Sequence, residues 1–197
     1  MGSDKLQIIL ASASPRREHL LREMGLRFTV VHPAGVEELL GGAAPDVVAM
    51  QNAQRKACVV AGRHLDSVVI GADTIVVLHG KIFGKPSDRE EAAQMLEQLA
   101  GQQHEVITGV CLLHRALDME LTFAESTRVW MHSLTHQQIA EYLARINPLD
   151  KAGAYAIQEH GEGIIERIDG SYHNVMGLPT ERLVATLERI GMVHRAS

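Results

Sequence analysis

The sequence Val68-Val69-Ile70-Gly71-Ala72-Asp73-Thr74-Ile75-Val76-Val77 consists mainly of apolar and β-branched residues and contains one acid, Asp73. A carboxylate is costly to bury unless a cation or hydrogen-bond donors accompany it. The alternative is a turn, because Gly and Asp both favour bends in the chain. We therefore predict two strand segments between residues 67 and 78, broken at Gly71-Ala72-Asp73, with Asp73 either at a turn or in a functional site.

Strand and helix patterns alternate on both sides of this segment. Ser14 and Asp46 can each cap a helix, the first with Pro15 in its first turn. Capping-box spacing marks two more helix starts, at Ser87-Asp88-Arg89-Glu90 and at Thr135-His136-Gln137-Gln138. The predicted strands are 6–10, 27–31, 67–78, 81–83, two between 103 and 132, and 163–168; the predicted helices are 15–24, 46–63, 87–100, 135–146 and 179–190.

These elements predict an α/β fold with a mixed β-sheet and flanking helices. Several neighbouring strands are joined as hairpins, which excludes a purely parallel sheet. The chain has 197 residues, of which 46% are hydrophobic, enough for one compact domain or two small lobes that share a cleft. We expect a single domain over residues 6–192. The loop 32–45 is rich in Gly and Pro, and we expect it to be mobile and able to act as a lid.

Composition and charge exclude several functions. The net charge is −5 and no basic run spans a face, which argues against binding a nucleic-acid polymer. No stretch is long and apolar enough for a membrane span, and the start of the chain lacks the apolar region of a signal peptide. Cys58 and Cys111 share no metal or redox spacing, so we expect two unpaired thiols. The sequence predicts a cytoplasmic protein.

The segment after the first strand has the features of an anion site. A loop that contains Ser12 and Ser14 leads into a helix N-terminus, whose N–H groups and dipole attract negative charge. Arg16 and Arg17 add positive charge at the same place. The alternative is a capped helix with solvated arginines. The loop lacks the Gly-Lys-Ser/Thr ending of a P-loop.

Further charged residues suit a polyphosphate and a hard metal ion. Lys56 lies on the edge of an apolar helix face, although a surface lysine is the common alternative there. Lys85 lies in a tight Gly-Lys-Pro loop that would hold its cation in one direction. Glu37 and Glu38 are either a solvated pair or, with Asp73, oxygen ligands for Mg²⁺ or Mn²⁺.

Other catalytic centres find no support in the sequence. No His or Cys spacing matches a zinc site, and His132 and His136 flank a strand end and a helix cap, where we expect both to be exposed. No Gly-x-Ser-x-Gly nucleophile elbow occurs. Cations for a polyphosphate, together with carboxylates for a metal and a water molecule, fit hydrolytic phosphoryl chemistry. The spacing does not identify the substrate.

Several motifs, taken in order, resemble the signatures of the Maf family of nucleoside triphosphate pyrophosphatases. They are Ala11-Ser12-Ala13-Ser14-Pro15-Arg16-Arg17, Gly71-Ala72-Asp73-Thr74, Gly84-Lys85-Pro86-Ser87-Asp88, Thr108-Gly109-Val110 and Asn174-Val175-Met176-Gly177-Leu178-Pro179. The resemblance implies a fold similar to inosine triphosphatases, with two lobes around a central cleft. It also implies a homodimer that cleaves nucleoside triphosphates to monophosphate and pyrophosphate with a divalent cation, Mg²⁺ or Mn²⁺.

The resemblance assigns roles to individual residues. Asp73 would accept the proton of the attacking water, and Glu38 and Asp73 would hold the metal. The residues that would contact the phosphates are Ser12, Arg17, Lys56 and Lys85. The residues that match the trio of the subgroup preferring dTTP, UTP and related modified pyrimidine nucleotides are Arg16, Thr74 and Gln158.

Two positions depart from the family pattern. Glu37 replaces the Asp in the middle of a Val-Asp-Glu motif, and Ala154 stands where relatives often carry glycine. We expect Ala154 to be tolerated if its φ is negative. The family is also associated with arrest of septum formation, so a non-enzymatic, nucleotide-binding regulator is the alternative function. Retention of Asp73, Lys56 and Lys85 favours the enzyme.

Overall fold

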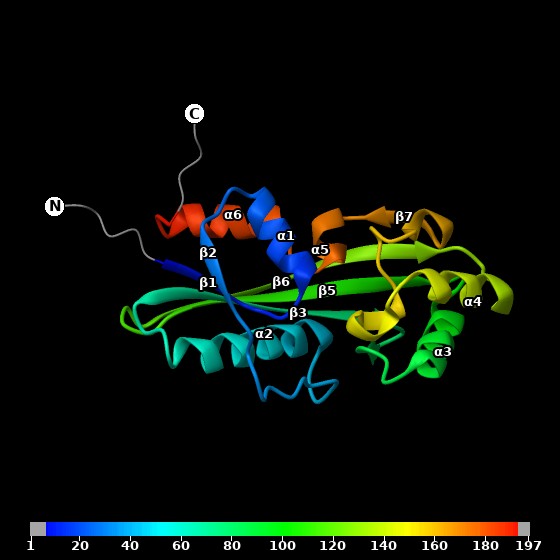
Figure 1. The fold of residues 1–197 in the computed structure, drawn as a ribbon, viewed down its shortest axis with the longest axis horizontal. Coiled ribbons are helices and arrows are strands. Elements are labelled where there is room, and N and C mark those ends of the chain that lie inside the picture. Colours follow the sequence, from blue (N-terminus) through cyan, green and yellow to red (C-terminus); the bar gives the residue numbers. More distant parts are fainter. Residues whose placement is uncertain (1–6, 193–197) are drawn as a thin grey trace.

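The computed structural model describes residues 7–192 and has a mixed β-sheet at its centre (Figure 1). The strands are β1 (Gln7–Ala11), β2 (Phe28–Val31), β3 (Ser67–Leu78), β4 (Lys81–Phe83), β5 (Gln103–His114), β6 (Met119–Met131) and β7 (Ile165–Asp169). Their spatial order is β2-β1-β3-β5-β6-β7, with β4 also paired to β3. β1 runs parallel to β2 and β3, and the other pairs are antiparallel, so the predicted mixed sheet is confirmed. Leu6, the predicted start of the first strand, lies outside the described residues.

Helices cover both faces of the sheet (Figure 1). They are α1 (Pro15–Glu23), α2 (Pro45–Ala61), α3 (Arg89–Leu99), α4 (His136–Arg145), α5 (Tyr172–Met176) and α6 (Thr180–Arg189), with 3₁₀ turns η1 (Pro148–Asp150), η2 (Ala152–Ala154) and η3 (Gly161–Gly163). On one face of β3, Val69 packs against α2. On the other face, Ile70 packs against α1 and α6, and Val76 packs further along against α3 and α4. Among the described residues, no helix is long and apolar enough to cross a membrane.

The predicted break at Gly71-Ala72-Asp73 is wrong, because β3 runs without interruption from Ser67 to Leu78. All three residues pair with β5, with Gly71 opposite Cys111 and Asp73 opposite Gly109. Gly71 has a role in packing instead of a turn. A Cβ at Gly71 would lie 2.2 Å from the carbonyl oxygen of Ala53 on α2, so the missing side chain lets the helix approach the strand.

Gly109 has the same role on β5, which gives a stability prediction. A Cβ there would lie 2.3 Å from the backbone carbonyl of Ala49 on α2, and neither backbone can move away independently. Gly109→Ala is expected to lower the free energy of unfolding by about 1–3 kcal/mol, as overpacking does. Urea unfolding measures this, with Gly163→Ala as the control because a Cβ at Gly163 meets nothing within 4 Å. Equal unfolding midpoints for the two variants would contradict the packing role.

One edge of β3 is open in the middle, and this opening places the site. β1 pairs with β3 only as far as Gly71, and β4 pairs with it only from Val76 onward. Between these points, the described residues provide no strand partner on that edge. Successive side chains of a strand point to opposite faces. Asp73 and Thr74 can therefore reach the same opening from the two faces of the sheet.

Helix starts and turns differ from prediction in several details. Ser14 occupies the cap position of α1 but makes no side-chain cap bond, and α2 begins at Pro45, one residue before the predicted Asp46 cap position. At α3 the cap is Asp88, which accepts from Glu91 N, so the predicted Ser87–Glu90 capping box is wrong. The Thr135 capping box is confirmed. The short helix α5, which Ser171 caps, lies between residues 168 and 179, where the sequence predicts neither a helix nor a strand.

Ala154 does not have the negative φ under which we expect an alanine to be tolerated. Its φ is +63°, and that of Gly153 beside it is +67°. A left-handed alanine costs about 1–2 kcal/mol, because its Cβ approaches the following carbonyl. Ala154 is fully buried in the core between α3 and α4, and this packing holds the conformation in place.

Candidate active site

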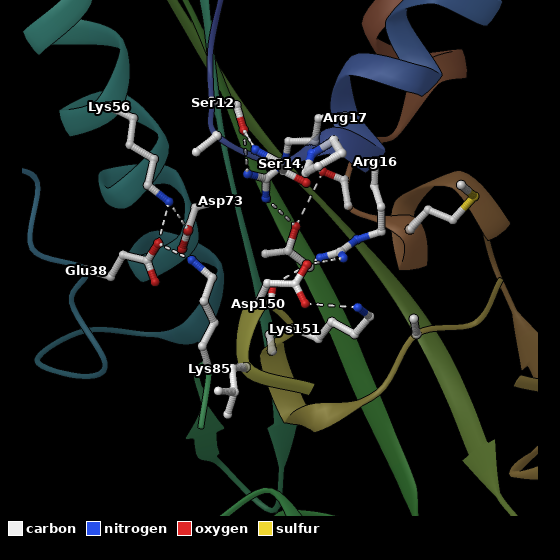
Figure 2. A pocket seen from close by; sticks show the side chains of 18 of the residues that line it. Ser12, Ser14, Arg16, Arg17, Glu38, Lys56, Asp73, Lys85, Asp150 and Lys151 are labelled. Carbon is white, nitrogen blue, oxygen red and sulfur yellow. Dashed lines mark hydrogen bonds and ion pairs between the residues drawn. The ribbon is translucent and has the colours of Figure 1, made fainter. Parts of the chain in front are cut away.

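A cleft of about 530 Å³ opens beside the free edge of β3. It is lined by all nine residues predicted for the site: Ser12, Arg16, Arg17, Glu38, Lys56, Asp73, Thr74, Lys85 and Gln158. Figure 2 shows how most of their side chains converge from α1, α2, β3 and the connecting loops. Glu37 is not among the lining residues; it is exposed, and its carbonyl oxygen accepts from Arg55.

Asp73 is buried, and both oxygens of its carboxylate are held. Lys56 Nζ lies 2.6 Å from Oδ1, and Asn52 Nδ2 donates to Oδ2 at 2.9 Å. Asn52 and Lys56 lie one helical turn apart on α2, the helix that Gly71 and Gly109 allow close to the sheet. The acid inside the apolar strand therefore has the cation and the hydrogen-bond donor that its burial requires.

Lys56 joins the carboxylates of Asp73 and Glu38. Its residue is 7% exposed, so the alternative of a surface lysine is wrong, and its Nζ lies 2.7 Å from Glu38 Oε1. Lys85 reaches the same oxygen at 3.1 Å from the more exposed side of the cleft. Burial alone would raise the pKa of Glu38, but the charges and hydrogen bonds of Lys56 and Lys85 outweigh it and lower that pKa to about 2. Glu38 is therefore ionised at neutral pH.

Arg17 is fixed on the opposite side of the opening. Its Nε donates to Gly177 O at 2.8 Å, and its Nη2 donates to Thr74 Oγ1 at 2.9 Å. Ser12 Oγ accepts from Arg17 Nη1 at 3.4 Å and from Ser14 N at 3.1 Å, which ties the loop before α1 to this guanidinium. Burial lowers the pKa of Arg17, and the charge of Asp73 opposes this change. A guanidinium is not deprotonated in proteins, so Arg17 remains a cation.

Two other predicted residues lie beside the 3₁₀ turns. Arg16 forms an ion pair with Asp150, with 3.0 Å between Nη1 and Oδ2. Gln158 Nε2 donates to Glu159 Oε1 over a long 3.4 Å. Burial would raise the pKa of Asp150, but Lys151 and Arg16 together lower it, so this carboxylate is also ionised.

Asn52 is the clearest residue that the sequence analysis missed. It is fully buried, and besides holding Asp73 it accepts from Leu39 N at 2.8 Å and donates to Leu39 O at 3.0 Å. One amide thus fixes Asp73 and the backbone next to Glu38. The amide orientation follows from its partners, since a flipped oxygen would face two acceptors. The signal in the sequence was an asparagine four residues before Lys56, on a helix face whose other buried residues are alanines and valines.

The carboxylates fit a hard divalent cation. Within residues 7–192, every ion pair of Glu38 uses Oε1, which leaves Oε2 available to a ligand. In the same part of the chain, no three His, Cys, Asp or Glu residues gather as a complete protein cage for a metal. Mg²⁺ usually binds through one or two carboxylates together with substrate phosphates and water. Glu38 and Asp73 suit that mode of binding.

Comparisons with known proteins place the chain in a family. The family model described as Maf-like protein matches residues 7–190. A protein of Pelotomaculum thermopropionicum named dTTP/UTP pyrophosphatase is 47% identical over 186 residues, which cover 94% of this chain and 97% of that protein. A protein of Halalkalibacterium halodurans with the same name is 47% identical over 188 residues, which cover 95% and 98%.

A solved structure supports the fold at much lower sequence identity. The Staphylococcus aureus Ham1 protein matches with a TM-score of 0.52 and 15% identity, over 93% of this chain and 99% of that one. Such a likeness shows the fold alone. The prediction of a mixed α/β sheet of the inosine-triphosphatase type is confirmed by it.

Proposed function

This chain belongs to the Maf family, and we propose that it is a pyrophosphatase that hydrolyses dTTP and UTP to the nucleoside monophosphate and pyrophosphate. The observation that carries the proposal is the arrangement of Asp73, Lys56 and Glu38 in the cleft. Lys56 Nζ lies 2.6 Å from the buried carboxylate of Asp73 and 2.7 Å from the carboxylate of Glu38, and Arg17 and Lys85 line the same cleft. Phosphoryl transfer depends on this kind of positioning and charge neutralisation.

In the proposed reaction, Asp73 accepts the proton of a water molecule that attacks the α-phosphorus. Asn52 and Lys56 hold the two oxygens of Asp73, so the carboxylate is oriented before substrate arrives. Arg17, Lys56 and Lys85, with the hydroxyl of Ser12, contact the phosphates. The negative charge that develops on the leaving pyrophosphate is then already neutralised.

Mg²⁺ or Mn²⁺ would bind to Glu38 and Asp73 in this proposal. When bound, the ion supplies a Lewis acid for the phosphate oxygens and lowers the pKa of a coordinated water. The donor set of two carboxylates supports the assignment. A homodimer and a cytoplasmic location stay predictions from the sequence.

Base selection is assigned to Arg16, Thr74 and Gln158. All three line the cleft, but their contacts differ. Thr74 Oγ1 accepts a hydrogen bond from Arg17 Nη2 at 2.9 Å and forms another with Thr108 Oγ1 at 2.9 Å. Thr74 therefore contributes by fixing the guanidinium of Arg17. Arg16 and Gln158 present groups to the cleft from the side of the 3₁₀ turns.

The position of bond cleavage tests the proposed reaction. Hydrolysis of dTTP or UTP with Mg²⁺ in ¹⁸O-labelled water is expected to release pyrophosphate and to place the label on the monophosphate, because water attacks the α-phosphorus. Label in inorganic phosphate, with a nucleoside diphosphate as the product, would show attack at the γ-phosphorus and contradict the mechanism. A panel of triphosphates with Mg²⁺ or Mn²⁺ that yields no product would favour the nucleotide-binding regulator.

A further inference from the structure

A buried lysine beside the 3₁₀ turns, Lys151, has no place in the reaction described above. Its side chain is 4% exposed, and its Nζ lies 2.8 Å from Asn147 O, 2.9 Å from Asp150 Oδ1 and 3.2 Å from Glu159 Oε2. The first two contacts are hydrogen bonds and the third is an ion pair. Lys151 lines the cleft, but its ammonium is held there by a backbone carbonyl and by two carboxylates of the protein itself.

Each of the two carboxylates that bind Lys151 also accepts a hydrogen bond, through its second oxygen, from a residue assigned to base selection. Asp150 Oδ2 accepts from Arg16 Nη1 at 3.0 Å, and Arg16 Nη2 also donates to Asp150 O at 3.1 Å. Glu159 Oε1 accepts from Gln158 Nε2. Figure 2 shows Arg16, Asp150 and Lys151 in this contact. We refer to these five residues, Arg16, Asp150, Lys151, Gln158 and Glu159, as the Lys151 network.

The network orients the side-chain amide of Gln158, a residue that lines the cleft. Gln158 turns its NH₂ group toward Glu159, because Nε2 donates to the carboxylate oxygen Oε1 at 3.4 Å. Its Oε1 is then the remaining polar atom, and it is buried without a hydrogen-bond partner among residues 7–192. Uracil and thymine carry an N–H donor at N3, whereas cytosine has an acceptor there. A fixed acceptor at Gln158 therefore complements uracil and thymine.

The backbone that carries Lys151 is itself anchored. Gly153 N donates to Gly84 O at 3.0 Å, which ties this segment to the loop of Lys85. The hydroxyl of the buried Tyr155 lies 2.7 Å from His104 Nε2 on β5. Because the backbone on this side is anchored, the orientation of Gln158 depends on the position of Glu159, which the ion pair with Lys151 holds.

We infer that Lys151 is a positioning residue for base selection, which holds Arg16 through Asp150 and fixes the acceptor end of Gln158 through Glu159, so that uracil and thymine are favoured over cytosine. The inference rests on the proposed function, because it assumes that the base lies beside Arg16 and Gln158. It adds three residues, Asp150, Lys151 and Glu159, to those that determine specificity.

Two variants test the inference. Glu159→Gln offers Gln158 both a donor and an acceptor, so the amide can turn, and Lys151→Met removes the cation that holds both carboxylates. For both we expect the ratio of kcat/KM for UTP to that for CTP, with Mg²⁺, to fall by about tenfold, since a site built for an N–H donor loses its discrimination. The matching readout is the ratio of dissociation constants for UMP and CMP, measured by calorimetry without metal.

Glu162→Gln is the matched control, because Glu162 is a nearby exposed carboxylate outside the network. Ratios that stay at the wild-type value in folded Glu159→Gln would overturn the inference. That variant carries the test if Lys151→Met does not fold, since the Glu159 side chain is 37% exposed. A wild-type chain that hydrolyses neither triphosphate contradicts the proposed function instead, and the UMP and CMP affinities still decide whether the network selects the base.

Discussion

Asp73→Asn is expected to keep the fold and to lower kcat for dTTP by about a hundredfold or more, the loss that follows removal of a general base. The amide has nearly the shape of the carboxylate and can still accept from Lys56 or Asn52 through its oxygen, so the α2–β3 contact persists. It cannot accept a proton from water at neutral pH. The measurement is single-turnover release of pyrophosphate, with thermal unfolding and nucleotide affinity determined for the same preparation.

Asp66→Asn is the control for this experiment, because Asp66 is an exposed carboxylate just before the same strand. It is expected to match the wild type in rate and in unfolding temperature. If folded Asp73→Asn also turned over dTTP at close to the wild-type rate, Asp73 would have no catalytic role, and another group would have to activate the water.

The mixed sheet and most helices could be predicted from the sequence, because periodicity and capping signals are local. The Thr135 capping box is an example, since both of its hydrogen bonds join residues three positions apart. The break predicted at Gly71 was wrong for a reason that is not local. Its missing side chain serves the approach of α2, and nothing in the strand's own sequence identifies the helix that packs there.

The same limit applies to the site. Motifs indicated the chemistry of Lys56 and Asp73, but a helix pattern alone could not distinguish a surface lysine from one buried between two carboxylates. Asn52 was missed because its partners, Leu39 and Asp73, come from a loop and from a strand further along the chain. These contacts depend on the tertiary packing that Gly71 and Gly109 permit.

The second large effect concerns Lys56, whose ammonium separates two carboxylates. Lys56→Met is expected to lower the free energy of unfolding by about 3–5 kcal/mol at pH 7, the cost of removing one partner of a buried ion pair. Methionine fills a similar volume, so lost packing contributes little. Asp73 then keeps only Asn52, and its charge faces Glu38 without a cation between them. Urea unfolding at fixed pH measures the difference.

The pH dependence of unfolding shows whether the loss of stability in Lys56→Met comes from the loss of the Lys56 charge. The pKa of Glu38 is lowered from 4.5 to about 2 in the folded protein, so its ion pairs stabilise the fold above about pH 4.5, and this contribution is lost as the pH falls toward 2. The difference between wild type and Lys56→Met should therefore be largest near pH 7 and smaller at pH 3. Lys85→Met is the control, because its half-exposed ion pair is worth only about 0–1 kcal/mol. A loss in Lys56→Met that is equal at pH 7 and pH 3 would mean that Lys56 acts through packing, and that the two carboxylates do not depend on its charge.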